Sequence, residues 1–147
     1  MQYAPWDEGR GTVTLSRLFE YTDDEVSATF KDGARVLFDK LIQLPCLFMQ
    51  EGTDDQLAYS GTISRARIVG NEIAIEYTFD RDIPPLLNRI IFAKKLDFDM
   101  PHDFEFSRCH WAIKTIDLYR VLLRNFQPRR QGDVPLDVEK RKPASLA

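Results

Sequence analysis

The residues best suited to chemistry gather in residues 97–114, DFDMPHDFEFSRCHWAIK, which hold both histidines of the chain. Imidazole and carboxylate groups bind zinc or manganese, so His102 with Asp99 or Asp103, together with His110, forms one candidate metal site. The spacing matches neither H-E-x-x-H nor a pair of C-x-x-C motifs. A solvated acidic loop is therefore the favoured interpretation, and no metal is predicted.

Cys109 is a candidate nucleophile, because a thiolate beside a histidine base can attack an electrophile. On an extended strand, however, neighbouring side chains point to opposite faces, so Cys109 and His110 would not face each other. His102 would reach the thiol only through a turn. Free cysteines are usually buried, and Cys46 and Cys109 are too few for a disulfide framework. We therefore expect two reduced, buried thiols and no catalytic residue.

His110 and Lys114 define a candidate binding face, since residues four apart on a strand share one face. A helix expected from Thr115 would present free N–H groups to an anion beside that face. Trp111 and Ile113 would point to the other face and join the core. Solvation of the two polar side chains is the simpler interpretation. His110, Lys114 and Trp111 are nevertheless the best candidates here for ligand binding.

Nucleic acid is an alternative partner suggested by the arginines. They form two sets along the chain: Arg65, Arg67, Arg81 and Arg89, then Arg120, Arg124, Arg129 and Arg130. Arginines near Tyr59 or Trp111 would contact phosphates while the rings stack on bases. The formal charge of −3 and the absence of a nucleic-acid motif count against this reading. Arg65 and Arg67 stay as candidate ligand-binding residues, with nucleic acid or a nucleotide as ligand.

The elements that must position these residues indicate an α+β fold. Residues 57–69 and 72–79 flank Gly70-Asn71, and the second run alternates apolar and polar residues, which predicts a β-hairpin. We expect further strands at 11–15, at 46–50 and from 104 to 113. Helical spacing of leucines and isoleucines predicts helices near 34–43, 84–95 and 115–125. The prediction is an antiparallel sheet centred on the hairpin at about 57–79, packed by about three helices.

Length and composition indicate one globular domain. The chain has 147 residues, of which 44% are hydrophobic and 29% charged, as in ordinary folded domains. We place the domain at 1–127 and a polar tail, containing proline, lysine and arginine, at 128–147. There is no run of about 20 apolar residues to span a membrane and no signal-peptide pattern. A cytoplasmic location, no membrane contact and no cofactor are expected.

The run HWAIKTIDL at 110–118, which follows DRDIPP at 80–85, resembles an uncharacterised domain of bacterial proteins. In that domain an H-W-A-V/I-K strand leads into a helix that begins D-L. The resemblance covers 61–123. It implies no established activity and no catalytic residue. It implies a bacterial source and an association with other modules of bacterial defence-type proteins.

These observations favour a small non-catalytic binding or interaction module of a bacterial cytoplasmic protein, with a protein partner or self-association. One alternative is an enzyme that acts on nucleic acid or nucleotides and uses residues 97–114. Another is a self-associating scaffold whose tail at 128–147 contacts a neighbouring subunit. Salt dependence tests for nucleic acid as the ligand, because binding to nucleic acid should weaken steeply as the salt concentration rises.

Overall fold

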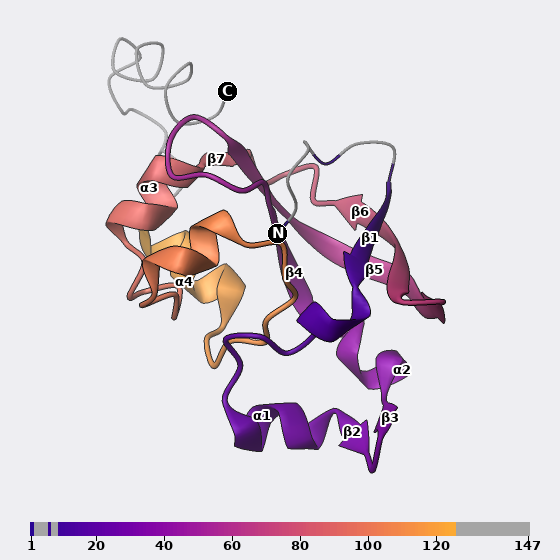
Figure 1. The fold of residues 1–147 in the computed structure, drawn as a ribbon. Coiled ribbons are helices and arrows are strands. Elements are labelled where there is room, and N and C mark those ends of the chain that lie inside the picture. The colour runs from indigo at the N-terminus through magenta and orange to yellow at the C-terminus, as the bar shows by residue number, and fades with distance from the viewer. Residues whose placement is uncertain (2–5, 7–8, 126–147) are drawn as a thin grey trace, which may run out of the picture.

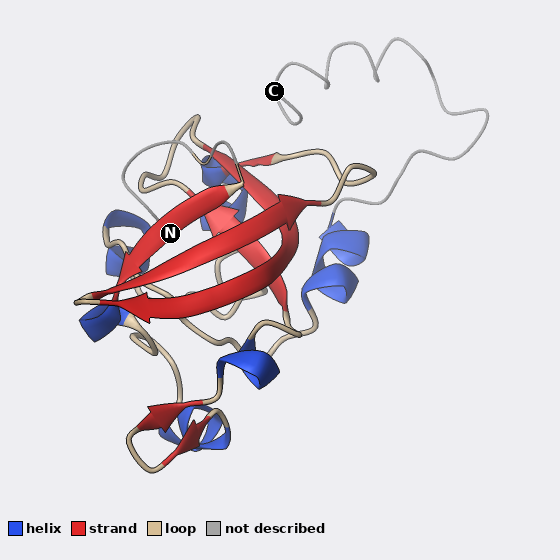
Figure 2. Ribbon diagram, turned by 90° about the vertical axis from the view of Figure 1, so that its right-hand side faces the viewer, coloured by secondary structure: helices blue, strands red, loops and turns tan. Residues whose placement is uncertain are grey.

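A curled antiparallel sheet forms the centre of the structure, a computed structural model that describes residues 1, 6 and 9–125. Its strands are β1 (Arg10–Thr14), β4 (Pro45–Met49), β5 (Leu57–Val69), β6 (Glu72–Phe79) and β7 (Leu86–Leu87). The order is β1-β6-β5-β4, with β7 pairing the start of β5. Figure 2 shows how the long strands curve, so that one face of the sheet is concave. The predicted α+β class is confirmed, whereas the predicted tail at 128–147 lies outside the described residues.

The β5–β6 hairpin forms as its sequence predicts. Val69 pairs with Glu72, and Gly70 takes a φ of 63°, a left-handed conformation that suits glycine at a hairpin turn. The alternate residues Ile73, Ile75 and Tyr77 are buried, which fits a strand with one core face. These side chains pack with Trp6, Phe48 and Ile63 on the concave side of the sheet. A register shift between Ile63 and Arg65 bends β5, as bulges do.

Four short α-helices occur in the described part of the chain, where about three were predicted. They are α1 (Asp24–Thr29), α2 (Phe38–Leu41), α3 (Asn88–Ala93) and α4 (Leu118–Asn125). Two 3-10 helices, η1 (Leu15–Arg17) and η2 (Asp103–Ser107), and a small hairpin of β2 (Lys31–Asp32) and β3 (Arg35–Val36) complete the fold. In Figure 1, α3 and α4 lie on one side of the sheet, while α1 and the β2–β3 hairpin lie below it.

Two helices are shorter than predicted because strand pairing takes part of their sequence. The helix expected over 34–43 is confined to α2, because Gly33, at a φ of 61°, forms the β2–β3 turn and the residues that follow it pair as β3. The helix expected over 84–95 starts only at Asn88. Pro84-Pro85 is followed by β7, which pairs with β5.

The segment after Met100 also departs from the sequence prediction. The strand expected over 104–113 is absent, and η2 is followed by irregular chain with a single parallel bridge between Trp111 and Leu18. The helix expected from Thr115 begins three residues later, at Leu118. Asp117 Oδ1 accepts the backbone N–H of Arg120 at 3.2 Å, which caps that helix. The helix start expected at Thr115, with its free N–H groups, therefore does not lie beside that residue.

Candidate ligand-binding cavity

A cavity of about 180 Å³ lies against the concave face of the sheet. Val13, Ile63 and Ile75 line it from the sheet, and residues 110–114 line it from the irregular segment. Most of the remaining wall is apolar. Its polar groups include those of His110, Lys114 and Cys46, the indole N–H of Trp6, and the amino end of Met1, which donates to the His110 carbonyl at 2.9 Å. Dry apolar cavities of about 150 Å³ can hold benzene, so this one has room for a small ring.

His110 contributes a neutral imidazole to this wall. The residue is only 5% exposed, and burial is the main reason that its pKa is lowered to about 4. Its Nδ1 lies 2.5 Å from the carbonyl oxygen of Arg108. A carbonyl can only accept, so Nδ1 carries the proton and Nε2 carries a lone pair. Within residues 1, 6 and 9–125, no hydrogen bond satisfies that Nε2 acceptor.

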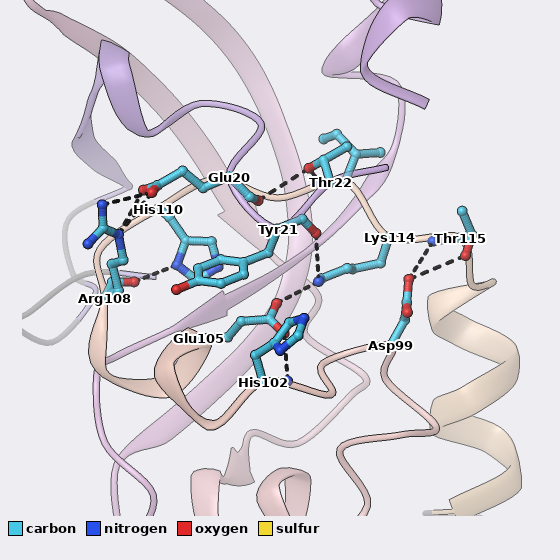
Figure 3. Close-up of polar contacts among 11 residues, drawn as sticks. Glu20, Tyr21, Thr22, Asp99, His102, Glu105, Arg108, His110, Lys114 and Thr115 are labelled. Carbon is cyan, nitrogen blue, oxygen red and sulfur yellow. Dashed lines mark hydrogen bonds and ion pairs between the residues drawn. The ribbon is translucent and has the colours of Figure 1, made fainter. Parts of the chain in front are cut away.

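Lys114, by contrast, has two hydrogen-bond partners (Figure 3). Its Nζ lies 2.5 Å from Glu105 Oε1 and donates to the carbonyl of Tyr21 at 2.9 Å. Glu105 is completely buried, and its Oε2 accepts the backbone N–H of His102 at 3.3 Å. A buried carboxylate is tolerated when an opposite charge and hydrogen bonds satisfy it. The pair therefore ties Tyr21, η2 and the cavity wall together.

The segment around Tyr21 is held in an unusual backbone conformation. Phe19 and Tyr21 have φ values of 67° and 54°, which are costly for residues with a side chain. Phe19 donates to the carbonyl of Trp111 at 2.7 Å, and Ile113 donates to Thr22 Oγ1 at 2.8 Å. The Tyr21 ring also meets the His110 ring edge-on, with centroids 5.0 Å apart. These contacts fix the cavity wall.

A second concave region, a groove of about 570 Å³, lies beside the same segment. It is lined by Thr14, Ser16, Arg17, Tyr21, Glu51, Phe104, Ser107, Arg108 and Cys109. Arg108 donates to both carboxylate oxygens of Glu20, at 2.9 and 3.1 Å. This hydrogen bonding raises the pKa of Arg108. Arg17 also lies 3.5 Å from Glu20. The cations of the groove therefore already face a carboxylate.

The structure brings together three of the five predicted ligand-binding residues. His110, Lys114 and Trp111 all line the cavity. Arg65 and Arg67 do not: both are exposed on the far half of β5, where they pair across the hairpin with Glu76 and Ala74.

Cys109 and the acidic loop do not make the contacts that thiol catalysis or metal binding would require. The Cys109 thiol donates to Glu51 Oε1 at 2.9 Å, whereas the His110 ring bonds to a backbone carbonyl. Asp99 accepts from the backbone N–H and hydroxyl of Thr115 at 3.2 and 3.3 Å. Among the residues that the structure describes, no three His, Cys, Asp or Glu side chains gather as a metal site.

Sequence reasoning missed Tyr21 and Glu105. Tyr21 lies 89 positions before His110, and nothing local indicates that the two rings meet. Glu105 is one of several acids in residues 97–114, but its spacing from His102 matches that of a residue which caps a helix start. That spacing was the one signal from which its burial could have been inferred.

The fold and the cavity define the class: an α+β domain whose curled antiparallel sheet forms one wall of a small, largely apolar cavity. Comparisons with protein-family models, with curated proteins and with solved structures found no match to this chain. No helix in the described ranges is long and apolar enough to cross a bilayer.

Proposed function

We propose that this protein is a non-catalytic binding module that holds a small, mostly apolar molecule in the cavity under the sheet. One observation carries the proposal: the neutral His110 presents an unbonded acceptor, Nε2, in a wall that is otherwise largely apolar. A ligand that supplies a hydroxyl or N–H group would donate a hydrogen bond to this acceptor.

Size and polarity together restrict the ligand. A volume of about 180 Å³ suits a molecule of one or two small rings or a short branched chain. Its apolar body would gain about 25 cal/mol for each Å² removed from water. At His110 itself a carboxylate would fit poorly, because a neutral imidazole acceptor repels its oxygens and the neighbouring Lys114 already pairs with Glu105. A phenol, an indole or a small alcohol has the required chemistry.

Isosteric pairs of small molecules test this proposal. Phenol and toluene differ by a hydroxyl in place of a methyl group, and indole and indene by an N–H in place of a CH₂. We expect phenol and indole to bind several-fold more tightly than their partners, measured by NMR titration of the methyl groups of Ile63 and Ile75. A His110→Leu variant should lose this preference, whereas a His102→Leu variant should keep it. Binding of none of the four probes at those methyl groups would refute the proposal.

An enzyme acting on nucleic acid or nucleotides has less support. Arg65 and Arg67 lie apart from both concave regions, and Lys114 is neutralised by Glu105. The nucleophile that such chemistry needs would have to lie within hydrogen-bond reach of a base. The Cys109 thiol hydrogen-bonds to Glu51 and the His110 ring to a backbone carbonyl, so the thiol and the imidazole do not pair with each other.

A further inference from the structure

The two edges of the sheet differ in how well they are protected. At one edge, β4 begins with Pro45, and the indole Nε1 of Trp6 donates to the carbonyl of Met49 at 2.8 Å. At the other edge, β1 has the sequence RGTVT, with neither proline nor lysine and an unbroken register against β6. Proline, lysine and bulges are the usual means of blocking an edge strand. Among the described residues, β1 therefore lacks the protection that β4 has.

The backbone groups that β1 directs away from the sheet can be identified from its pairing. Tyr77 donates to Gly9 and Leu15 donates to Asn71, so the odd-numbered residues of this strand face β6. In an antiparallel ladder the intervening residues point the other way. Arg10, Thr12 and Thr14 thus direct their N–H and C=O groups outward. Within the described residues, the one hydrogen bond to these groups is a long contact of 3.4 Å from the Tyr77 hydroxyl to the Arg10 carbonyl.

A second copy of β1 complements this edge. If two β1 strands pair antiparallel about a two-fold axis at Thr12, Thr12 faces Thr12 and Arg10 faces Thr14 of the other copy. In this register Arg10, Thr12 and Thr14 each face a residue whose N–H and C=O groups also point outward. Each facing pair can then form two hydrogen bonds. Facing threonines are also a favourable cross-strand pair. Neighbouring registers of β1 on itself satisfy fewer of these groups.

Charges on the outer face of the sheet favour the same arrangement. Within one copy, Arg10 pairs with Glu76, and Glu76 pairs with Arg65, so the signs alternate across the three strands. In the second copy, Thr14 pairs with Glu72. Adjacent strands lie about 4.8 Å apart, so Glu72 of the second copy would stand about 10 Å from Arg10, which two long side chains can bridge. Like charges do not face each other, and the net charge of −3 is small.

We propose that two copies of this protein associate through antiparallel pairing of their β1 strands, which continues the sheet from one copy into the other. The paired edge is only five residues long, so the interface is smaller than that of a stable dimer and the association is dependent on concentration. This proposal is independent of the ligand-binding cavity.

Sedimentation velocity of the full chain tests the proposal. The weight-average mass should rise from 17.1 kDa toward twice that value between low-micromolar and high-micromolar concentrations. Amide exchange should slow at Thr12 and Thr14 over the same range, because pairing buries their outward N–H groups. A mass that stays at the monomer value throughout would overturn the proposal.

Two variants locate the interface. Thr12→Pro removes an outward donor while leaving the β1–β6 ladder intact, and should raise the dissociation constant at least tenfold. Arg10→Glu places a carboxylate near two others and should weaken association similarly, whereas adding Glu72→Arg should restore part of it. Arg35→Glu, on the separate β2–β3 hairpin, is the matched control and should have no effect. Association unchanged by both Thr12→Pro and Arg10→Glu would place the interface elsewhere and refute the pairing.

Discussion

The buried imidazole of His110 should make the protein lose stability as the pH falls below neutral. Burial lowers the pKa of His110 to about 4, whereas an unfolded chain has the ordinary value of about 6.5. Between about pH 4 and pH 6.5 the imidazole is protonated in the unfolded state but not in the folded state, so lowering the pH favours unfolding. The contribution of the neutral ring is fully present above pH 6.5 and is lost as the pH falls toward 4. Below about 4 the loss levels off.

The magnitude follows from the two pKa values. At 1.36 kcal/mol per pKa unit, the interval between about 4 and about 6.5 corresponds to roughly 3 kcal/mol of unfolding free energy. About 2.5 kcal/mol of this should already be lost at pH 4.5. Such a loss is a large fraction of the stability of a domain of this size.

Urea unfolding from pH 7.5 to 4.5 measures this effect in the wild type and in His110→Gln. The carboxylates common to both proteins titrate alike, so the stability difference isolates the imidazole. We expect the wild type to lose about 2–3 kcal/mol more than His110→Gln over this range. His102→Gln, which changes an exposed histidine, should follow the wild type. Parallel curves for the wild type and His110→Gln would refute the reasoning.

Three further predictions concern the packing and the buried polar groups. A Cβ atom on Gly61 would lie 2.2 Å from the carbonyl oxygen of Thr78, so Gly61→Ala should cost at least about 2 kcal/mol; an unchanged melting temperature would contradict the β5–β6 register. Lys114→Met leaves the carboxylate of Glu105 buried and unpaired, and should cost about 3–5 kcal/mol. In a urea-unfolding cycle, Lys114→Met with Glu105→Leu should cost less than the sum of the single changes, whereas additive costs would show that the two groups do not interact. Cys46 and Cys109 are half-buried, not fully buried as expected. Desolvation still raises the pKa of Cys46 to about 11, so iodoacetamide at pH 8 should modify it at least about a hundredfold more slowly in the native protein than in urea, by mass spectrometry; comparable rates would show that the thiol is not desolvated.

The parts of the fold that were predictable are those whose pattern is local. The alternation in β6 and the Gly70-Asn71 turn specify a hairpin without help from distant residues. The stripe of Leu118, Val121 and Leu122 similarly identifies α4. The helix predicted over 84–95 forms only from Asn88, because Leu86 and Leu87 fit a helix locally but find strand partners on β5. Tertiary pairing overrides propensity in such short segments.

The candidate site was predictable only in part, for a related reason. His110 and Lys114 were grouped by strand parity, yet Trp111, expected on the opposite face, lines the same cavity. The segment is irregular, so alternation does not apply to it. Its conformation is set by contacts with Phe19, Tyr21 and Thr22, which no local pattern reveals.

His110 and Lys114 line the same cavity, but their bonding assigns them different roles. The Lys114 ammonium contacts Glu105 and the Tyr21 carbonyl, and these two contacts position the wall. The His110 Nε2 acceptor has no hydrogen-bond partner among the described residues, so it can accept from a ligand. Lys114→Met should therefore change the affinities for phenol and toluene together, leaving their ratio near the wild-type value. His110→Leu should bring that ratio close to one. If NMR titration shows the ratio falling equally in both variants, the preference arises from the shape of the cavity, and His110 is not the ligand's hydrogen-bond partner.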